Sequence, residues 1–227
     1  EQALGPDHPY VAYPLNNLGN LYYDQGKHEL AEPLYQRALH IREQALGPDH
    51  PQVASPLTNL GNLYYDQGQY ELAEPLYQRA LHIWEQALGP HYSRVAHPLN
   101  GLANLLREQG RYEQADVLYQ RALLLRQEHL GPRHPEVADT LHDLARLRER
   151  QQQLTEALSL YQQALPIREQ ALGSHHPKTT QIRQRLHALL QDLGRTEEAA
   201  VLEAPSDHTR QEGGETNTSS DAIGTAG

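Results

Sequence analysis

The chain has 227 residues, a formal net charge of −10, and no Cys, Met or Phe. Without cysteine it forms no disulfide and offers no thiolate as a nucleophile or metal ligand. An acidic chain without a basic block is a poor electrostatic match for nucleic acid or an anionic membrane. No apolar run approaches the roughly 20 residues that a membrane span needs. These features favour an interaction partner made of protein, and the absence of cysteine is compatible with the cytoplasm, where we expect the chain to act.

The sequence repeats with a period of 42 residues. EQALG occupies residues 1–5, 43–47, 85–89 and 169–173, and the variant QEHLG occupies 127–131. A fixed period in this range is typical of repeat arrays, in which each unit buries its apolar face against its neighbours. We therefore expect a stack with a long, thin core.

Each unit reads as two helices. Leu15, Leu18 and Tyr22 recur at helical spacing and face inward in a first helix that ends at Gly26. A second helix follows and stops at Gly47. The expected fold is all-α, a right-handed α-solenoid of antiparallel helix pairs. The predicted pairs are 9–25/28–46, 51–67/70–88, 93–109/112–130 and 135–150/154–172.

The repeat decays toward the C-terminus. In the fourth unit, Arg148 replaces a tyrosine, Gln152 replaces the turn glycine, and Pro166 is predicted to kink the second helix. We expect this unit to be the least stable of the four full units. The expected organisation is 1–8, the end of a preceding repeat and a linker in a longer protein; repeats 9–50, 51–92, 93–134 and 135–176; a partial capping repeat, 177–203; and a disordered tail, 204–227.

The spacing within each unit resembles the tetratricopeptide pattern, carried in the first unit by Leu15, Leu18, Gly19, Tyr22, Ala31 and Tyr35. The 42-residue period and the LGxDHP linker are similar to the tetratricopeptide repeats of kinesin light chains and of bacterial signalling proteins. The resemblance implies a non-catalytic scaffold that needs no cofactor and binds an extended peptide or partner segment in its concave groove. The alternative is a sensing or structural repeat segment of a larger nucleotide-binding signalling ATPase.

In tetratricopeptide arrays the first helix of each unit lines the groove. Asn20 recurs as Asn62 and Asn104, and we call these three residues the amide ladder. Asn offers donors and an acceptor that suit a peptide backbone, and we expect the ladder to contribute little to packing. A solvated polar face is the alternative. The predicted groove residues are Asn16, Asn20, Tyr23, Asn59, Asn62, Tyr65, Asn100, Asn104, Arg107, His142 and Arg146, with Thr58 and Glu149 at equivalent places.

The charge along this surface changes sign. Arginines appear in its later part, at residues 107, 146, 150 and 185, and would fit a partner that is acidic toward one end. Nearby acids, Asp139, Asp143 and Glu149, offer the alternative that these arginines are neutralised within the chain.

Two further patterns bear on sites. His8, His50, His134 and His176 hold the same place in successive linkers, about a repeat apart and too distant to share a metal ion. We expect them to bond to the backbone at helix starts, and we predict no metal site. Trp84 replaces the arginine of the preceding unit and is expected on the outer or edge surface, as packing rather than as a contact anchor.

Overall fold

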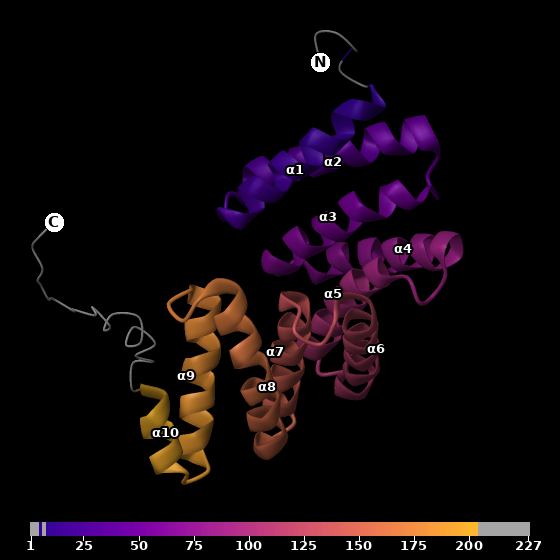
Figure 1. Ribbon diagram of the computed structural model, residues 1–227. Helices are drawn as coiled ribbons and strands as arrows, with labels where there is room; N and C mark the ends of the chain where they lie inside the picture. Colours follow the sequence, from indigo (N-terminus) through magenta and orange to yellow (C-terminus); the bar gives the residue numbers. More distant parts are fainter. Residues whose placement is uncertain (1–4, 6–7, 204–227) are drawn as a thin grey trace, which may run out of the picture.

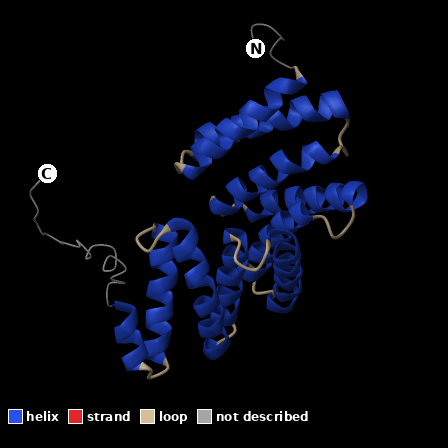
Figure 2. Cartoon of the chain, viewed as in Figure 1, coloured by secondary structure: helices blue, strands red, loops and turns tan. Residues whose placement is uncertain are grey.

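The computed structural model describes residue 5 and residues 8–203. The predicted tail and most of the predicted N-terminal linker lie outside these residues. Figure 2 shows that the described part is built from helices and loops without a strand. The all-α fold is thereby confirmed. The helices are α1 (Pro9–Asp24), α2 (His28–Leu46), α3 (Ala54–Asp66), α4 (Tyr70–Leu88), α5 (Ala96–Glu108), α6 (Tyr112–Leu130), α7 (Pro135–Arg150), α8 (Leu154–Leu172), α9 (Pro177–Asp192) and α10 (Thr196–Glu203).

Consecutive helices pair and the pairs stack into a curved solenoid, which Figure 1 shows running from α1 to α10. The second helix of each full unit begins and ends at the predicted residues. The first helices of units two and three begin later than predicted, after short 3-10 turns at Pro51–Val53 and Ser93–Val95. Such turns are common at helix N-termini, where the first N–H groups have no intrahelical partner.

The second helix of each unit contributes one fully buried tyrosine to the core. Tyr35 and Tyr77 are at most 1% exposed. A Cβ at Gly19 would come within 2.6 Å of the Tyr35 ring, and one at Gly61 within 2.7 Å of the Tyr77 ring. These glycines are therefore required because the aromatic ring packs directly against the backbone of the first helix.

The first helix of the array departs from the predicted inward face. Leu18 is 39% exposed, whereas its equivalent in the second unit, Leu60, is 3% exposed. Leu60 packs against Ala31 and Tyr35 of the preceding helix pair. Among the described residues no helix pair stands before α1, so Leu18 lacks that contact and the prediction for it was wrong.

Of the second-helix residues singled out from the sequence, Trp84 differs from expectation, and the kink at Pro166 stays a prediction. Trp84 is 3% exposed and packs in the core with Val53 and Leu99, so its predicted surface position was wrong. Its ring lies between the second and third units, and its Nε1 donates to the Pro51 carbonyl at 3.0 Å. Pro166 does not interrupt α8, which continues to Leu172 with the proline ring on its exposed face.

The turn of the fourth unit carries backbone strain. Gln152 has φ 63°, where Gly26, Gly68 and Gly110 hold the equivalent turns at φ 70–75°. A side chain in this left-handed region costs about 1 kcal/mol. We therefore expect Gln152→Gly to raise the free energy of unfolding by about 1 kcal/mol, measured by urea denaturation. The reciprocal variant, Gly68→Gln, should lose a similar amount, and an unchanged or lowered stability of Gln152→Gly would contradict this reading.

Candidate functional site

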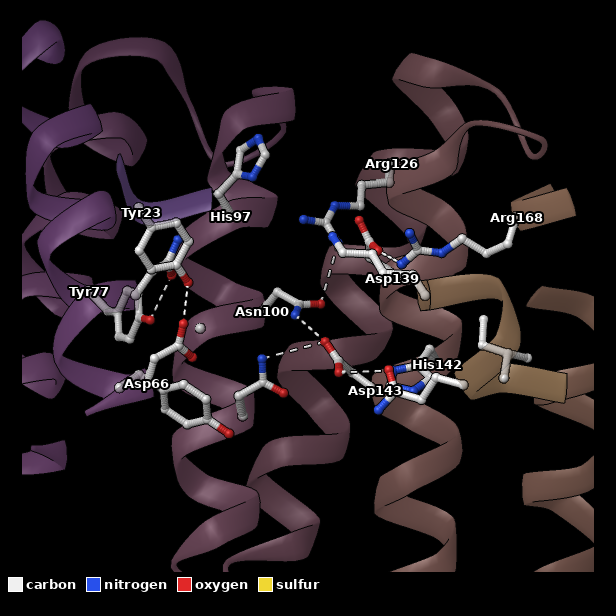
Figure 3. Close-up of a pocket in the computed structure, with 17 residues that line it drawn as sticks. Tyr23, Asp66, Tyr77, His97, Asn100, Arg126, Asp139, His142, Asp143 and Arg168 are labelled. Atoms are coloured by element: carbon white, nitrogen blue, oxygen red, sulfur yellow. Dashed lines mark hydrogen bonds and ion pairs between the residues drawn. The ribbon is translucent and has the colours of Figure 1, made fainter. Parts of the chain in front are cut away.

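The inner surface of the solenoid carries a polar hollow of about 350 Å³, the central hollow. It is lined from five first helices, α1, α3, α5, α7 and α9, together with residues of α4, α6 and α8. Figure 3 shows Asn100, His142 and Asp143 meeting on its floor. The first helices thus lie along one concave side, and of the predicted groove residues Tyr23, Asn62, Tyr65, Asn100, Asn104 and His142 line this hollow.

Two more hollows continue the surface toward the N-terminus. The amide hollow, about 430 Å³, contains Asn16, Asn20, Thr58 and Asn59 and shares Asn62 with the central hollow. The aromatic hollow, about 660 Å³, lies beyond it at the helix starts of the first three units. It shares Asn16, Ser55, Trp84 and Arg94 with the amide hollow. Neighbouring hollows share lining residues, and together the three hollows lie along the first helices from α1 to α9.

Each amide of the ladder is held by the buried tyrosine of its own unit. The tyrosine hydroxyl donates to the asparagine Oδ1 in three successive units. These bonds anchor the second helix to the first, so the expectation that the ladder contributes little to packing was wrong. The pairs are Tyr35–Asn20 at 2.9 Å, Tyr77–Asn62 at 2.7 Å and Tyr119–Asn104 at 2.6 Å.

A side chain of the following unit also bonds to the ladder amide at two of the three junctions between the four full units. Asn59 donates to Oδ1 of Asn20 at 2.9 Å. One carboxylate, Asp143, accepts from Asn100 at 2.7 Å and from Asn104 at 3.4 Å. The equivalent position between them is Gly101, where a Cβ would come within 2.4 Å of the Tyr77 ring.

The missing bridge leaves Asn62 unlike the other two ladder residues. Its Oδ1 accepts one bond, from Tyr77, and its NH₂ group donates to no described residue. In Asn20 and Asn104 the Oδ1 atom already accepts two bonds. Asn62, which borders both the central and the amide hollow, is therefore the ladder amide with most bonding capacity left for a ligand.

Arg107 lies beneath the groove surface rather than on it. It is 2% exposed, and its guanidinium donates to Tyr119 at 2.8 Å and to Tyr65 at 3.2 Å. It also pairs with Glu108 at 3.0 Å and stands 3.8 Å from Asp143. Because these groups occupy its donors, Arg107 joins the third unit to Tyr65 of the second and to Asp143 of the fourth instead of meeting a partner carboxylate.

Most of the later arginines of the groove are paired within the chain. Arg146 and Arg150 lie 3.9 Å and 3.4 Å from the carboxylate of Glu108. Arg168 pairs with Asp139. The internal neutralisation that the sequence left open is thus present for Arg107, Arg146 and Arg150, and Glu108, which the sequence reasoning missed, provides much of it. Arg185 makes no ion pair among the described residues.

Asp143 is the carboxylate at the centre of this network. Burial alone would raise its pKa, but the hydrogen bond from His142 and the positive charge of Arg107 outweigh burial and lower the pKa to about 2. The group is therefore ionised throughout the neutral range and stays an acceptor for the asparagines beside it. The sequence named Asp143 as a possible partner of the arginines but did not predict its bonds to Asn100 and Asn104, because the equivalent positions of the two preceding units are Asn59 and Gly101.

A second group that sequence reasoning missed is a set of buried arginines on the second helices. Arg42 donates to the Gln52 carbonyl, and Arg126 donates to the Glu136 carbonyl at 3.1 Å. Each bond joins a unit to the first turn of the next. The sequence pointed to this role by repeating arginine at the same position of the four full units, with Trp84 as the exception.

The linker histidines cap the helices that follow them. Nδ1 of His8, His50, His134 and His176 accepts from the backbone N–H two residues later, at 3.2–3.3 Å. The predicted backbone role of these histidines is confirmed. In the part of the chain that the structure describes, no three His, Asp or Glu side chains are grouped as a metal site.

Comparison with solved structures finds the same architecture in several repeat proteins. BtubC (BKLC) from P. vanneervenii is 22% identical, with a TM-score of 0.73 over 96% of this chain and 89% of that one. A putative kinesin light chain from Podosopora anserina, with nearly identical TPR-like repeats, is 23% identical, with a TM-score of 0.67 over 90% of this chain and 99% of that one. RapI in its apo form is 17% identical, with a TM-score of 0.66 over 84% and 67%.

No curated protein matches the chain. Within the described residues no helix is both long and apolar enough to cross a membrane. The family model described as tetratricopeptide repeat matches residues 1–44, 10–86, 55–123, 94–170 and 145–203, which together cover the solenoid. The chain therefore belongs to the tetratricopeptide repeat family, whose fold is a general scaffold for protein–protein interaction.

Proposed function

We propose that the chain binds an extended segment of a partner protein in its concave groove, without catalysis. The observation that carries this proposal is the continuity of the three hollows across the first helices of all five helix pairs. An extended chain is the ligand shape that follows such a groove, as a compact ligand would fill one hollow only. The net charge of −10 disfavours nucleic acid as the occupant, and we place this binding in the cytoplasm.

The grip on the ligand backbone is assigned to Asn62. Its free N–H groups and its remaining acceptor capacity face a groove in which peptide carbonyls and amides need partners. Asn20, Asn59, Asn100 and Asn104 stand beside it with fewer free positions. Asn16 accepts a single bond, from Asn59, but is buried, whereas Asn62 is half-buried. Arg107 and Arg146 pair with Glu108 and support the groove wall, so we do not expect them to contact the ligand directly.

The test is the affinity of the double variant Asn62→Ala/Tyr77→Phe for a peptide selected from a library against the unmodified chain. Replacing both partners of the internal bond leaves no stranded hydroxyl, so the fold is retained. We expect binding to weaken by about 1 kcal/mol for each hydrogen bond lost to Asn62. Tyr77→Phe alone is the matched control and should bind as the unmodified chain does. If the double variant binds the peptide as tightly as the unmodified chain does, the ligand does not bind at this part of the groove.

A further inference from the structure

Four aromatic residues of the aromatic hollow are departures from the repeat. At the position of Tyr10 the other units have Gln, Arg, Glu or Lys. At the position of Tyr13 they have Ser, His, Asp or Gln. Trp84 replaces an arginine, and Tyr92 replaces the histidine of the other linkers. They come from the first two units and line one hollow. Because repetition serves the shared fold, this convergence of unrepeated residues points to a role that only this place in the stack has.

The exposure of these tyrosines is only partly an effect of the open end of the array. Tyr10 is 77% and Tyr13 67% exposed. The positions equivalent to both remain exposed or half-buried in the interior units, as Gln52 and Ser55 illustrate. Leu18 behaves differently, since its equivalents are buried by the preceding pair. Stacking a further unit before α1 would therefore leave the two tyrosine rings facing the hollow.

Two of the aromatic replacements give up a bond that the repeat otherwise makes. The helix start at Tyr92 lacks the side-chain cap that histidine provides in the other linkers. Trp84 cannot make the bond by which Arg42 and Arg126 hold the first turn of the following unit. A lost cap alone costs about 1 kcal/mol. The replacement at Tyr92 thus gives up a contact that stabilises the other helix starts, whereas Trp84 exchanges the bond of the arginine for one to the Pro51 carbonyl of its own unit.

The charge of the hollow is opposite to that of the chain. Its lining includes Arg42 and Arg94 and no carboxylate. Arg42 donates to the Gln52 carbonyl, whereas Arg94 makes no described hydrogen bond or ion pair and is exposed. A ligand that fills the hollow would therefore gain from a carboxylate placed beside Arg94.

We propose that the aromatic hollow binds a proline-rich segment of the partner in the polyproline II conformation, with an acidic residue beside Arg94. Aromatic-lined grooves accept pyrrolidine rings in this conformation, which is already ordered before binding and leaves its carbonyls unpaired. Asn17 and Gln52 line the same hollow, are exposed, and offer N–H donors to those carbonyls. The inference rests on the proposed function, because the hollow forms one end of the same groove.

The test is a titration of the chain with a synthetic oligoproline peptide that carries one glutamate. Trp84 is the only tryptophan of the chain, so its fluorescence reports on this hollow directly, and calorimetry gives the affinity. We expect saturable binding with a change in Trp84 emission. A peptide with alanine in place of every proline should not bind, and one with lysine in place of the glutamate should bind several-fold more weakly.

The variant Tyr10→Gln/Tyr13→Ser introduces the residues of the second unit and should fold normally. We expect it to bind the oligoproline about tenfold more weakly or worse, given the contribution of aromatic contacts. Val117→Ser changes an exposed residue of α6 to the residue of the fourth unit and should bind as the unmodified chain does. No binding, equal binding of the alanine peptide, or unchanged affinity of the tyrosine variant would each overturn the proposal.

The two proposals fail in different ways. If a selected partner peptide depends on Asn62 but the oligoproline does not bind, the aromatic hollow has another role and the proposed groove function stands. If the oligoproline binds with an effect on Trp84 while Asn62 has no influence on any selected peptide, the ligand is held by the aromatic hollow alone.

Discussion

Replacing Arg107 by methionine is expected to lower the free energy of unfolding by about 3–5 kcal/mol, the usual cost of removing one partner of a buried ion pair. The guanidinium is 2% exposed and donates to Tyr65, Tyr119 and Glu108. Methionine fills a similar volume but leaves these acceptors, and the Asp143 carboxylate, without their cation. Urea denaturation followed by circular dichroism measures the loss.

Arg150→Met is the matched control, because Arg150 pairs with the same Glu108 from an exposed position. It should cost less than about 1 kcal/mol, as surface ion pairs do. Equal losses in the two variants would show that burial of Arg107 is not what gives the network its strength. If Arg107→Met does not fold, Arg107→Lys keeps the charge and should lose less.

The same network predicts how stability depends on pH. The pKa of Asp143 is lowered to about 2 in the folded chain, from 3.8 in the unfolded one. A carboxyl with a depressed folded pKa stabilises the fold above its unfolded pKa, and this contribution falls away as the pH drops from about 4 to about 2. In the Asp143→Asn variant, the free energy of unfolding should no longer fall by this contribution between about pH 4 and pH 2. An unchanged acid profile would contradict the assignment.

How much of the fold the sequence predicts depends on repetition. The period predicted the bounds of the second helix of each full unit to the residue. It could do so because Gly47 and its equivalents end these helices with a positive φ that glycine adopts readily. That the first helices line a groove was implied by the resemblance to tetratricopeptide repeats, and the central hollow is lined from these helices. What fails is the environment of single residues. Trp84 appears on an outer surface only if its helix is considered alone, without the next unit that covers it.

The candidate site illustrates the same limit. The recurrence of Asn20, Asn62 and Asn104 was visible in the sequence, but the tyrosines that hold them lie 15 residues further along, on another helix. A polar residue facing a groove and a polar residue bonded to a buried hydroxyl have the same helical spacing. Only the approach of the two helices, which the small residues Gly19, Gly61 and Ala103 allow, separates these cases.

Changing Asn20, Asn62 and Asn104 together to alanine is expected to destabilise the solenoid by on the order of 5 kcal/mol, since each change strands a buried tyrosine hydroxyl at about 1–3 kcal/mol. Each hydroxyl donates to the amide of its own unit at 2.6–2.9 Å. The favourable helix propensity of alanine offsets only about 0.6 kcal/mol for each change. The measurement is thermal and urea unfolding of the triple variant.

Replacing Tyr35 and Tyr77 by phenylalanine in the same variant should restore most of the loss in the first two units, because no buried hydroxyl there then lacks a partner. Tyr119 is kept, because its hydroxyl also accepts from the buried Arg107. Tyr161 supplies a control, since its hydroxyl makes no hydrogen bond of ordinary geometry among the described residues. Tyr161→Phe should therefore cost less than Tyr77→Phe in the unmodified chain. If the triple alanine variant is as stable as the unmodified chain, the ladder is a solvated polar face, and the tyrosine bonds do not hold the helices together. If it is destabilised and then rescued, the amides serve the fold and the groove at once, and variants that remove both partners are the ones that isolate binding.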